Sequence, residues 1–525
     1  MAKTTTRAVF WLWSALAGVI SAAVFLAVAE ALALITDRNG SPILAVGGFV
    51  IDIVPQPFKE FAITTFGEYD KIALLVGLGL AVLIASAIAG ILQFLKPPLG
   101  IIALVIAGIL SVAAIVTRAG ATAISAIPAI AGTVASCFLL WFLIMRLRRW
   151  AAADLSATNS PAQDDSGKSV DRRTFFAVSA IAGASAVLVG VGARVANVAT
   201  SSIDSVRKAL KLPAPKSTIS IPAGAELDVE GVSSLITSNE DFYRVDTALT
   251  VPSIDPSSWR LTITGMVDEE IQLSFDDLVG MGLDEFAITL TCVSNEVGGD
   301  LLGNAIWLGI PVRDVLKKAG VKSGADMVLS RSVDGFTAST PLESLTDDGL
   351  DAILAVGMNG EPLPLEHGFP VRMVVPGLYG YVSATKWLTE LKVTTFADDE
   401  AYWTPRGYSA KAPIKFSSRI DTPRPGTPIT AGRTAIAGMA WAQTVGIERV
   451  EVKIDDGDWQ SATTSEPINS DTWVQWYLDW DAEPGTHYIS VRAVNKNGDL
   501  QIEERAPIAP DGSAGWQRTL VTVSS

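Results

Sequence analysis

The chain has 525 residues and only two cysteines, so it is long enough for several domains and does not depend on a disulfide framework. Residues 1–200 carry a net charge of +4, from 14 Lys/Arg and 10 Asp/Glu, whereas residues 201–525 carry −19, from 26 and 45. A second half this acidic would repel phosphate backbones, which argues against nucleic acid as a partner.

Apolar stretches dominate the first 150 residues, and each is near the roughly 20 residues that a helix needs to cross a bilayer. They predict four transmembrane helices, at about 8–35, 71–95, 100–117 and 121–145. The apolar run 43–54 is too short to span and contains Asp52, so we expect an interfacial or re-entrant segment there.

Basic residues predict the orientation of these helices. The cluster at 146–149 follows the fourth stretch and is expected on the cytoplasmic side, together with the N-terminus. Residues 151–198 begin with a polar stretch, which predicts a cytoplasmic linker. The pair Arg172–Arg173 follows, and then an apolar run of small residues to about 193. The plain interpretation is a fifth span. The sharper one is a resemblance to a twin-arginine export signal, which carries folded, cofactor-loaded proteins across the membrane.

Both interpretations place residues after about 198 outside the cytoplasm, so we expect a multi-pass protein of the cell membrane with an extracytoplasmic soluble part. The two histidines, His367 and His487, both belong to that part. The membrane helices therefore cannot supply a bis-histidine haem site. If electrons cross the membrane, a separate haem protein or a quinone must carry them.

The soluble part predicts a linker and two domains. Residues 199–235 contain three prolines and predict the linker. Residues 236–420 mix short alternating runs, such as 259–263, with helical stretches, such as 311–319, which is typical of an α+β domain.

Residues 421–525 begin with a proline-rich stretch and then read as strands at 449–454, 472–480 and 487–494, with Asp-Gly and Asn-Gly turns. This pattern predicts an all-β, immunoglobulin-like sandwich.

Five motifs in order along 236–400 resemble the molybdopterin-binding domain of the sulfite oxidase family. They are FYRVDTALTV (242–251), LTCVSN (290–295), NAIWLGIPVRDV (304–315), SVDGFTASTPL (332–342) and MNGEPLPLEHGFPVRMVVPGLYGYVSATKWL (358–388). The segments 437–441 and 515–516 resemble the dimerisation domain that follows it in this family, which implies a homodimer.

The resemblance implies a molybdenum-molybdopterin cofactor, with Cys292 as the thiolate ligand of the metal. Without it, a lone cysteine would be expected to be a small buried hydrophobe. The resemblance also implies that Arg244 is a catalytic residue beside the substrate oxygen. It places the pterin and its phosphate against Asn239, Tyr243, His367, Arg372, Ser383 and Lys386. Without it, the charged members of this set would be expected at the surface.

Three positions depart from the sulfite oxidase pattern. Glu296 and Val297 stand where sulfite oxidases have two arginines, and Phe336 stands at the position of their active-site tyrosine. A carboxylate buried beside a dianion would cost on the order of several kcal/mol. We therefore expect reduction of a neutral oxo-acceptor, such as a sulfoxide, an N-oxide or an oxidised methionine residue, in preference to sulfite oxidation.

Sulfite oxidation stays open as an alternative. The same departures leave open a rival of another class, in which the chain is a non-catalytic membrane scaffold or sensor that binds a cofactor or ligand. A transporter is less expected, because few ionisable residues, Glu30 foremost, lie within the spans.

Overall fold

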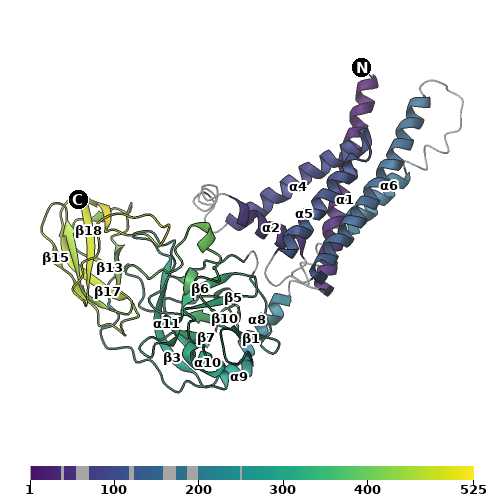
Figure 1. The fold of residues 1–525 in the computed structure, drawn as a ribbon. Helices are drawn as coiled ribbons and strands as arrows, with labels where there is room; N and C mark the ends of the chain where they lie inside the picture. Colours follow the sequence, from purple (N-terminus) through teal and green to yellow (C-terminus); the bar gives the residue numbers. More distant parts are fainter. Residues whose placement is uncertain are drawn as a thin grey trace. The chain divides into compact units, whose positions relative to one another are not determined.

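The computed structural model describes residues 2–36, 41–54, 65, 70–117, 123–157, 173–185, 199–248 and 251–525. Within it the chain divides into two compact units. One comprises residues 1–201 with 247–250, and the other comprises residues 202–246 and 251–525 (Figure 1).

The first unit is helical. Its elements are α1 (Ala2–Thr36), α2 (Pro42–Ile53), α4 (Asp70–Leu95), α5 (Leu99–Val116), the 3-10 turn η3 (Ala123–Ala126) and α6 (Ile127–Ala157). Four stretches are long and apolar enough to cross a membrane: Ala8–Ala33, Ala73–Leu95, Leu99–Val116 and Ala123–Ala152. They coincide with the four predicted spans. The short run 43–54 forms α2.

The predicted fifth span is described only in part. Residues 173–185 are helical, whereas Arg172 and the end of the apolar run lie outside the described residues. The twin-arginine interpretation therefore stays a prediction.

Small residues bring α1 and α4 into close contact. A Cβ atom added at Gly18 would collide with the carbonyl oxygen of Ser86, and one added at Gly90 would collide with that of Ser14. Ser14 and Gly18 are four residues apart on α1, and Ser86 and Gly90 are four residues apart on α4. This spacing of small residues lets helix backbones approach closely in membranes. The outward side chains include exposed Val76, Leu80 and Ile84 on α4, as expected for helices that face lipid.

The second unit begins with the α+β domain, which contains two sheets. The first sheet has the order β2-β1-β10-β5-β6 and is antiparallel except for the parallel pair β1–β10. Its strands are β1 (Arg260–Gly265), β2 (Ile271–Ser274), β5 (Met327–Ser332), β6 (Thr337–Pro341) and β10 (Leu388–Thr394). The second sheet has the order β3-β4-β7-β8, and β9 pairs with β7. Its strands are β3 (Asp284–Thr291), β4 (Leu302–Pro311), β7 (Ile353–Met358), β8 (Glu361–Pro362) and β9 (Arg372–Val374).

Short helices connect these strands: α9 (Phe275–Val279), α10 (Val312–Ala319), α11 (Leu342–Thr346) and α12 (Gly380–Ser383), with 3-10 turns η4 (Leu365–His367) and η5 (Thr404–Arg406). The helix predicted at 311–319 is α10. It buries Val312, Val315, Leu316 and Ala319, which share one face at helical spacing. This face joins the main core of the domain, together with Leu261 of β1.

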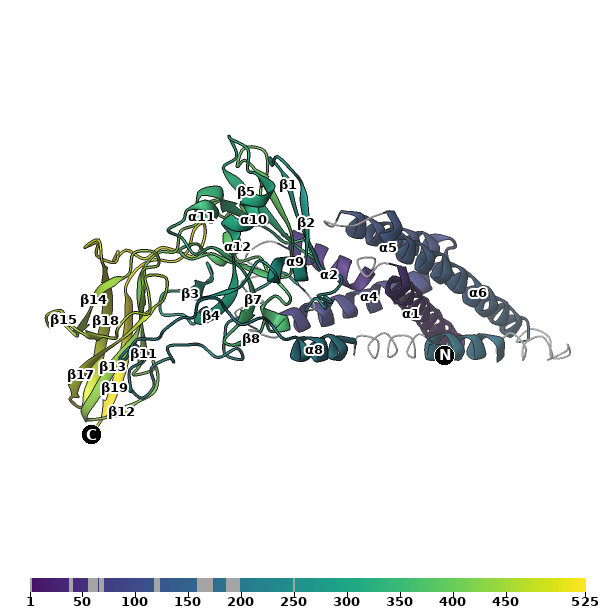
Figure 2. The ribbon, with the colours of Figure 1, turned by 90° about the horizontal axis from the view of Figure 1, so that it is seen from below.

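Residues 417–525 are all described and contain strands but no helix. One sheet has the order β11 (Ser417–Thr422), β13 (Gly432–Trp441), β17 (Val474–Ala482) and β16 (Thr463–Thr464). The other has the order β12 (Ile429–Thr430), β19 (Gln517–Ser524), β18 (Gly485–Asn495), β14 (Ile447–Ile454) and β15 (Gln460–Ser461), and Figure 2 shows these strands running side by side at the C-terminal end. The all-β prediction agrees with this architecture. β11 crosses the predicted boundary at 420, because it pairs with β13 of this domain.

The segment predicted as a linker is ordered and packed. It begins with helix α8 (Ala199–Ala209), and the backbone of Lys216 and Ser217 then bonds to that of Leu283 and Glu285. Further along, Leu235 is buried in a small core with Trp441 and Trp473 of the C-terminal domain. The prolines disfavour regular strand pairing here. The segment nevertheless contacts both soluble domains.

Candidate active site around Cys292

Cys292 lies in the turn that joins β3 to β4, and its side chain is buried. The turn is closed by backbone bonds from Cys292 N to Leu301 O (2.9 Å) and from Asn295 N to Cys292 O (3.0 Å). The sulfur accepts a long bond from Ser294 N at 3.4 Å. Burial raises the pKa of this thiol, and the Ser294 bond offsets only part of the rise. Backbone hydrogen bonds thus fix the position of Cys292, and its sulfur makes only a weak hydrogen bond that a metal would have to displace.

The C-terminal domain clamps this turn. Ser513 Oγ donates to Asn295 O at 2.6 Å, and Arg419 Nη1 donates to Gly299 O at 3.0 Å. Arg419 is buried and forms an ion pair with buried Asp421, with 2.6 Å between Nε and Oδ1. The position of the cysteine turn therefore depends on residues more than 100 positions away in the sequence.

We expect Arg419→Met to lower the free energy of unfolding by about 3–5 kcal/mol, because it leaves the buried Asp421 carboxylate unpaired. Denaturant unfolding of the purified chain measures this loss. Arg433→Met is the matched control, since Arg433 and Asp479 are 75% and 57% exposed and a solvent-screened pair contributes little to stability. Equal losses in the two variants would contradict a structural role for the Arg419 clamp.

A second contact from the C-terminal domain supports β3, the strand that leads to Cys292. Thr289 N donates to Asp471 O at 3.0 Å, and Thr289 Oγ1 accepts a bond from Trp473 N at 2.9 Å. Burial, and then the nearby carboxylate of Asp351, raise the pKa of Asp471 to about 6, although Thr444 N donates to its side chain.

This raised pKa predicts that the ionised Asp471 carboxylate lowers the free energy of unfolding at neutral pH. Between the unfolded value near 4 and about 6, the folded chain binds more protons at Asp471, so stability falls as the pH rises through this window. We expect Asp471→Asn to raise the free energy of unfolding at pH 7.5 by up to about 3 kcal/mol and to change it little at pH 4. Thermal unfolding at both pH values measures the difference, with the exposed Asp458→Asn as control. A gain of equal size at both pH values would exclude ionisation as its cause.

Arg372, on β9, is a buried cation, 5% exposed. Its guanidinium donates to three backbone carbonyls: Met373 at 3.3 Å, His367 at 3.1 Å and Ala384 at 3.5 Å. Among the described residues no carboxylate forms an ion pair with it, and burial lowers its pKa to about 10. A buried positive charge without a counter-ion favours an anionic ligand.

Two further cations meet at Asp246, whose side chain is buried. Asp246 Oδ2 accepts bonds from Lys386 Nζ at 2.8 Å and from Arg244 Nε at 2.9 Å. Lys386 also donates to Glu366 O at 3.0 Å. Burial lowers the pKa of Lys386 to about 8, against the opposing effect of Asp246. Asp246 belongs to the first motif, but its bridging position was not predicted.

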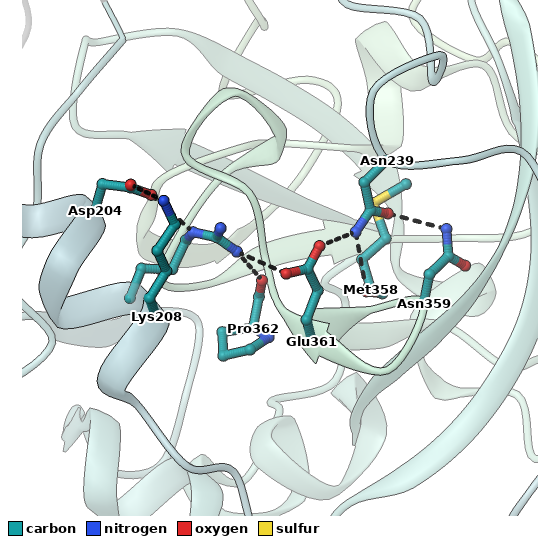
Figure 3. Close-up of polar contacts among 8 residues, drawn as sticks. Asp204, Lys208, Asn239, Met358, Asn359, Glu361 and Pro362 are labelled. Carbon is teal, nitrogen blue, oxygen red and sulfur yellow. Dashed lines mark hydrogen bonds and ion pairs between the residues drawn. The ribbon is translucent and has the colours of Figure 1, made fainter.

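His367, in η4, is held by Asn239. The ring nitrogen Nε2 lies 3.0 Å from the Asn239 carbonyl oxygen, so it carries the hydrogen. Burial and the charge of Arg372 lower the pKa of His367 to about 4, which keeps the ring neutral above that pH. The amide of Asn239 is used within the protein: it donates to Glu361 Oε1 at 2.6 Å and accepts from Asn359 Nδ2 at 2.9 Å (Figure 3). Asn239 therefore supports His367 through its backbone.

Of the remaining predicted residues, Tyr243 lies close to the cysteine turn. A Cβ atom built on Gly380 would lie 4.0 Å from the Tyr243 hydroxyl and 3.9 Å from Thr291 O. Burial raises the pKa of Tyr243. Ser383 Oγ donates to Tyr379 O and Leu378 O within the turn of α12.

Tyr379 was not predicted as a functional side chain. It is buried, and burial raises its pKa to about 12, so its hydroxyl keeps its proton. The nearby Asp511 acts in the same direction, while a bond from Lys415 N opposes it. Only its place in the last motif signalled it in the sequence.

These residues fit a molybdopterin cofactor. Thr291 Oγ1, next to Cys292, is buried and has no hydrogen-bond partner, and Arg372 has no counter-ion in the described part of the chain. Within that part, no group of three His, Cys, Asp or Glu side chains could hold a metal ion by itself. A metal that arrives with its own dithiolene ligands needs only one protein thiolate, and Cys292 is suited to supply it.

Glu296 is not buried, although the sequence led us to expect it. Glu296 is exposed, whereas Asn295 is the buried residue of the turn and accepts a bond from Leu301 N at 3.0 Å. The expected cost of a buried carboxylate beside a dianion is therefore absent. Phe336 is half-buried between β5 and β6, with its ring 5.8 Å from that of Tyr402.

Arg406, the last residue of η5, contacts the same Tyr402 ring that lies near Phe336. The Arg406 guanidinium stacks 3.7 Å from the centroid of the Tyr402 ring. Trp403 packs against the main core, as expected for an aromatic residue near a strand.

A buried thiol and the buried cations Arg372 and Lys386, with Tyr243 near both the thiol and Arg372, are the features of a molybdopterin-binding oxidoreductase domain on this α+β scaffold. In agreement, residues 248–403 match the oxidoreductase molybdopterin binding domain family. The chain is 31% identical over 323 residues to the mitochondrial sulfite oxidase of Rattus norvegicus, and the aligned region covers 52% of this chain and 59% of the relative. It is 36% identical over 154 residues to the uncharacterized oxidoreductase YuiH of Bacillus subtilis, which covers 29% of this chain and 74% of the relative.

The chain belongs to the sulfite oxidase family, and its cofactor is molybdenum-molybdopterin. A third relative, the NADH nitrate reductase of Spinacia oleracea, is 33% identical over 178 residues, which are 29% of this chain and 19% of that protein. The chain spans about three fifths of the length of the mammalian sulfite oxidases that it matches.

Proposed function

We propose that the chain is a membrane-anchored, extracytoplasmic oxidoreductase that either adds one oxygen atom to a small molecule and removes two electrons from it, or removes one oxygen atom and adds two electrons. The observation that carries this proposal is the buried Cys292 thiol in the same domain as the cations Arg372, Lys386 and Arg244, with Tyr243 near both the thiol and Arg372. When bound, the molybdenum cofactor supplies the redox chemistry; the protein supplies binding, orientation and electrostatics.

The side chains divide this work. Burial keeps the free Cys292 thiol protonated at neutral pH, so binding of the metal must release that proton. Arg372 and Lys386 would hold the phosphate of the pterin, and a planar guanidinium suits two phosphate oxygens at once. Arg244 is 37% exposed, which leaves it accessible to a substrate oxygen while Asp246 holds its Nε.

The sequence-based preference for sulfoxide or N-oxide reduction is not retained. Its main support was the burial of Glu296, and that side chain is exposed. Sulfite oxidation is therefore the first candidate, in line with the names of the mammalian relatives. Reduction of a sulfoxide, an N-oxide or an oxidised methionine residue is the second, supported by the apolar Val297 and Phe336.

The test uses the full chain, purified in detergent from its native host. Stoichiometric molybdenum and pterin support the proposal, and the absence of both would overturn it in favour of a non-catalytic scaffold or sensor that binds another ligand. Oxidation of sulfite with ferricyanide as acceptor is then compared with reduction of methionine sulfoxide and trimethylamine N-oxide by reduced viologen. The pair of activities decides between the two candidate directions.

The membrane assignment is part of the same proposal. Four apolar helices and the basic residues at 146–149 support a multi-pass anchor, with the soluble unit outside after a fifth span. Protease digestion of intact spheroplasts should remove the soluble unit. Export that persists after Arg172→Lys with Arg173→Lys would refute the twin-arginine signal.

We further infer two partners. The C-terminal sandwich, proposed as immunoglobulin-like and of the dimerisation type, supports a homodimer. Light scattering of the detergent-purified chain tests this inference. The two histidines of the chain both lie in the soluble unit, so a separate haem protein or a quinone is proposed as the electron-transfer partner.

A further inference from the structure

Helix α8 is joined to the cofactor site by one continuous path of hydrogen bonds. The path starts at Arg207, whose side chain is only 11% exposed although α8 belongs to the segment predicted as a linker. Its guanidinium donates to Asp204 Oδ1 at 3.3 Å, to Glu361 Oε2 at 3.3 Å and to Pro362 O at 3.0 Å. Arg207 thus fixes the two residues of β8 to the helix.

Glu361 connects Arg207 to Asn239, because its two carboxylate oxygens have different partners. Oε2 accepts from Arg207, and Oε1 accepts from Asn239 Nδ2 at 2.6 Å (Figure 3). Asn359 Nδ2 donates to the other end of the Asn239 amide and to Thr237 O, both at 2.9 Å. The Asn239 side chain is therefore held at both ends.

The last two links reach the buried cation. The Asn239 carbonyl oxygen lies 3.0 Å from His367 Nε2, and the His367 carbonyl oxygen accepts from Arg372 Nη1 at 3.1 Å. Displacing the Asn239 backbone would free the His367 ring and allow η4 to move relative to Arg372. Hydrogen bonds to charged groups, which make up the outer part of this path, are about twice as strong as neutral ones.

We propose that Arg207 is a positioning residue for the cofactor site, which acts through Glu361 and Asn239 to fix the His367 ring and the carbonyl that holds Arg372. This inference rests on the proposed function. An arginine suits the position, because its fork reaches three acceptors at once, whereas a lysine ammonium is a single point charge. Loss of a residue that supports a metal or cofactor site typically weakens binding by about 10–100-fold.

The chain provides a matched control on the same helix. Lys208 is the next residue and pairs with the other oxygen of the same Asp204, Oδ2, at 2.6 Å (Figure 3). It is 66% exposed and is connected to the path only indirectly, through the bond from Arg207 to Asp204. Lys208→Met removes one positive charge from α8, as Arg207→Met does, without touching Glu361.

The experiment compares Arg207→Met, Glu361→Gln, the double variant and Lys208→Met in the full-length protein. Molybdenum and pterin per chain are measured after dilution. We expect dissociation to be about 10–100-fold more favourable in each single variant, no further loss in the double variant, and no change in Lys208→Met. Arg207→Lys should restore only part of the retention.

A second readout reports the His367 ring itself. Hydrogen exchange at the ring carbon of histidine, followed by mass spectrometry, resolves the two histidine peptides of the chain, and His487 serves as internal reference. We expect His367 to exchange faster in Arg207→Met and Glu361→Gln, with His487 unchanged. If Arg207→Met fails to fold, Glu361→Gln carries the test, because it keeps the α8 side chains.

Retention and His367 exchange equal to those of the unmodified chain in both variants would overturn the inference. If the unmodified chain contains no molybdenum, the proposed function fails separately, and His367 exchange alone then decides whether Arg207 positions the ring.

Discussion

Cys292→Ser is expected to abolish stoichiometric molybdenum in the purified chain while leaving it folded. Cys292 is the proposed thiolate ligand of the metal, and a serine hydroxyl is a hard donor that keeps its proton at neutral pH. Oxidoreductase activity should fall by more than the roughly 10–100-fold that loss of a supporting residue costs. Elemental analysis and a turnover assay on the same sample measure both effects.

The fold of this variant should persist, because serine is smaller than cysteine and can accept the bond from Ser294 N. Cys137→Ser is the matched control, since Cys137 is the other free cysteine and lies in α6, outside the catalytic domain. A full metal load in Cys292→Ser would remove the ligand assignment.

Arg372→Met is expected to weaken cofactor binding by at least about 100-fold, because each hydrogen bond to a charged group contributes roughly 1.5–3 kcal/mol and the guanidinium can make two to a phosphate. Arg372→Lys should recover little, since an ammonium cannot reproduce the fork. Pterin fluorescence after oxidative release, together with molybdenum content, measures the loss.

The control is Arg331→Met, a partly exposed arginine of the same domain whose partner is the carboxylate of Glu390. Its cofactor content should match that of the unmodified chain. Normal retention in Arg372→Met, with loss in Lys386→Met, would move the phosphate site to the Lys386–Asp246 side and refute the assignment of Arg372.

Local patterns were sufficient for much of the architecture. The four membrane-type helices follow from apolar length alone, because a bilayer requires about 20 such residues in a row. Helix α10 follows from the spacing of Val312, Val315 and Leu316, and the C-terminal strands follow from alternation between Asp-Gly and Asn-Gly turns. Cys292 was found through the motif around it, whose residues are adjacent in the chain.

Tertiary structure decided how the site is assembled, because its contacts join residues that are far apart in sequence. Lys386 and Asp246 are 140 positions apart, Asn239 and Glu361 are 122 apart, and Arg419 and Gly299 are 120 apart. The exposure of Glu296, which moves sulfite from the alternative to the first candidate substrate, is likewise a property of the folded turn. Hydrophobic periodicity reports which face of an element is buried, but it carries no information on which distant polar groups meet there, and those pairings set the charge of this site.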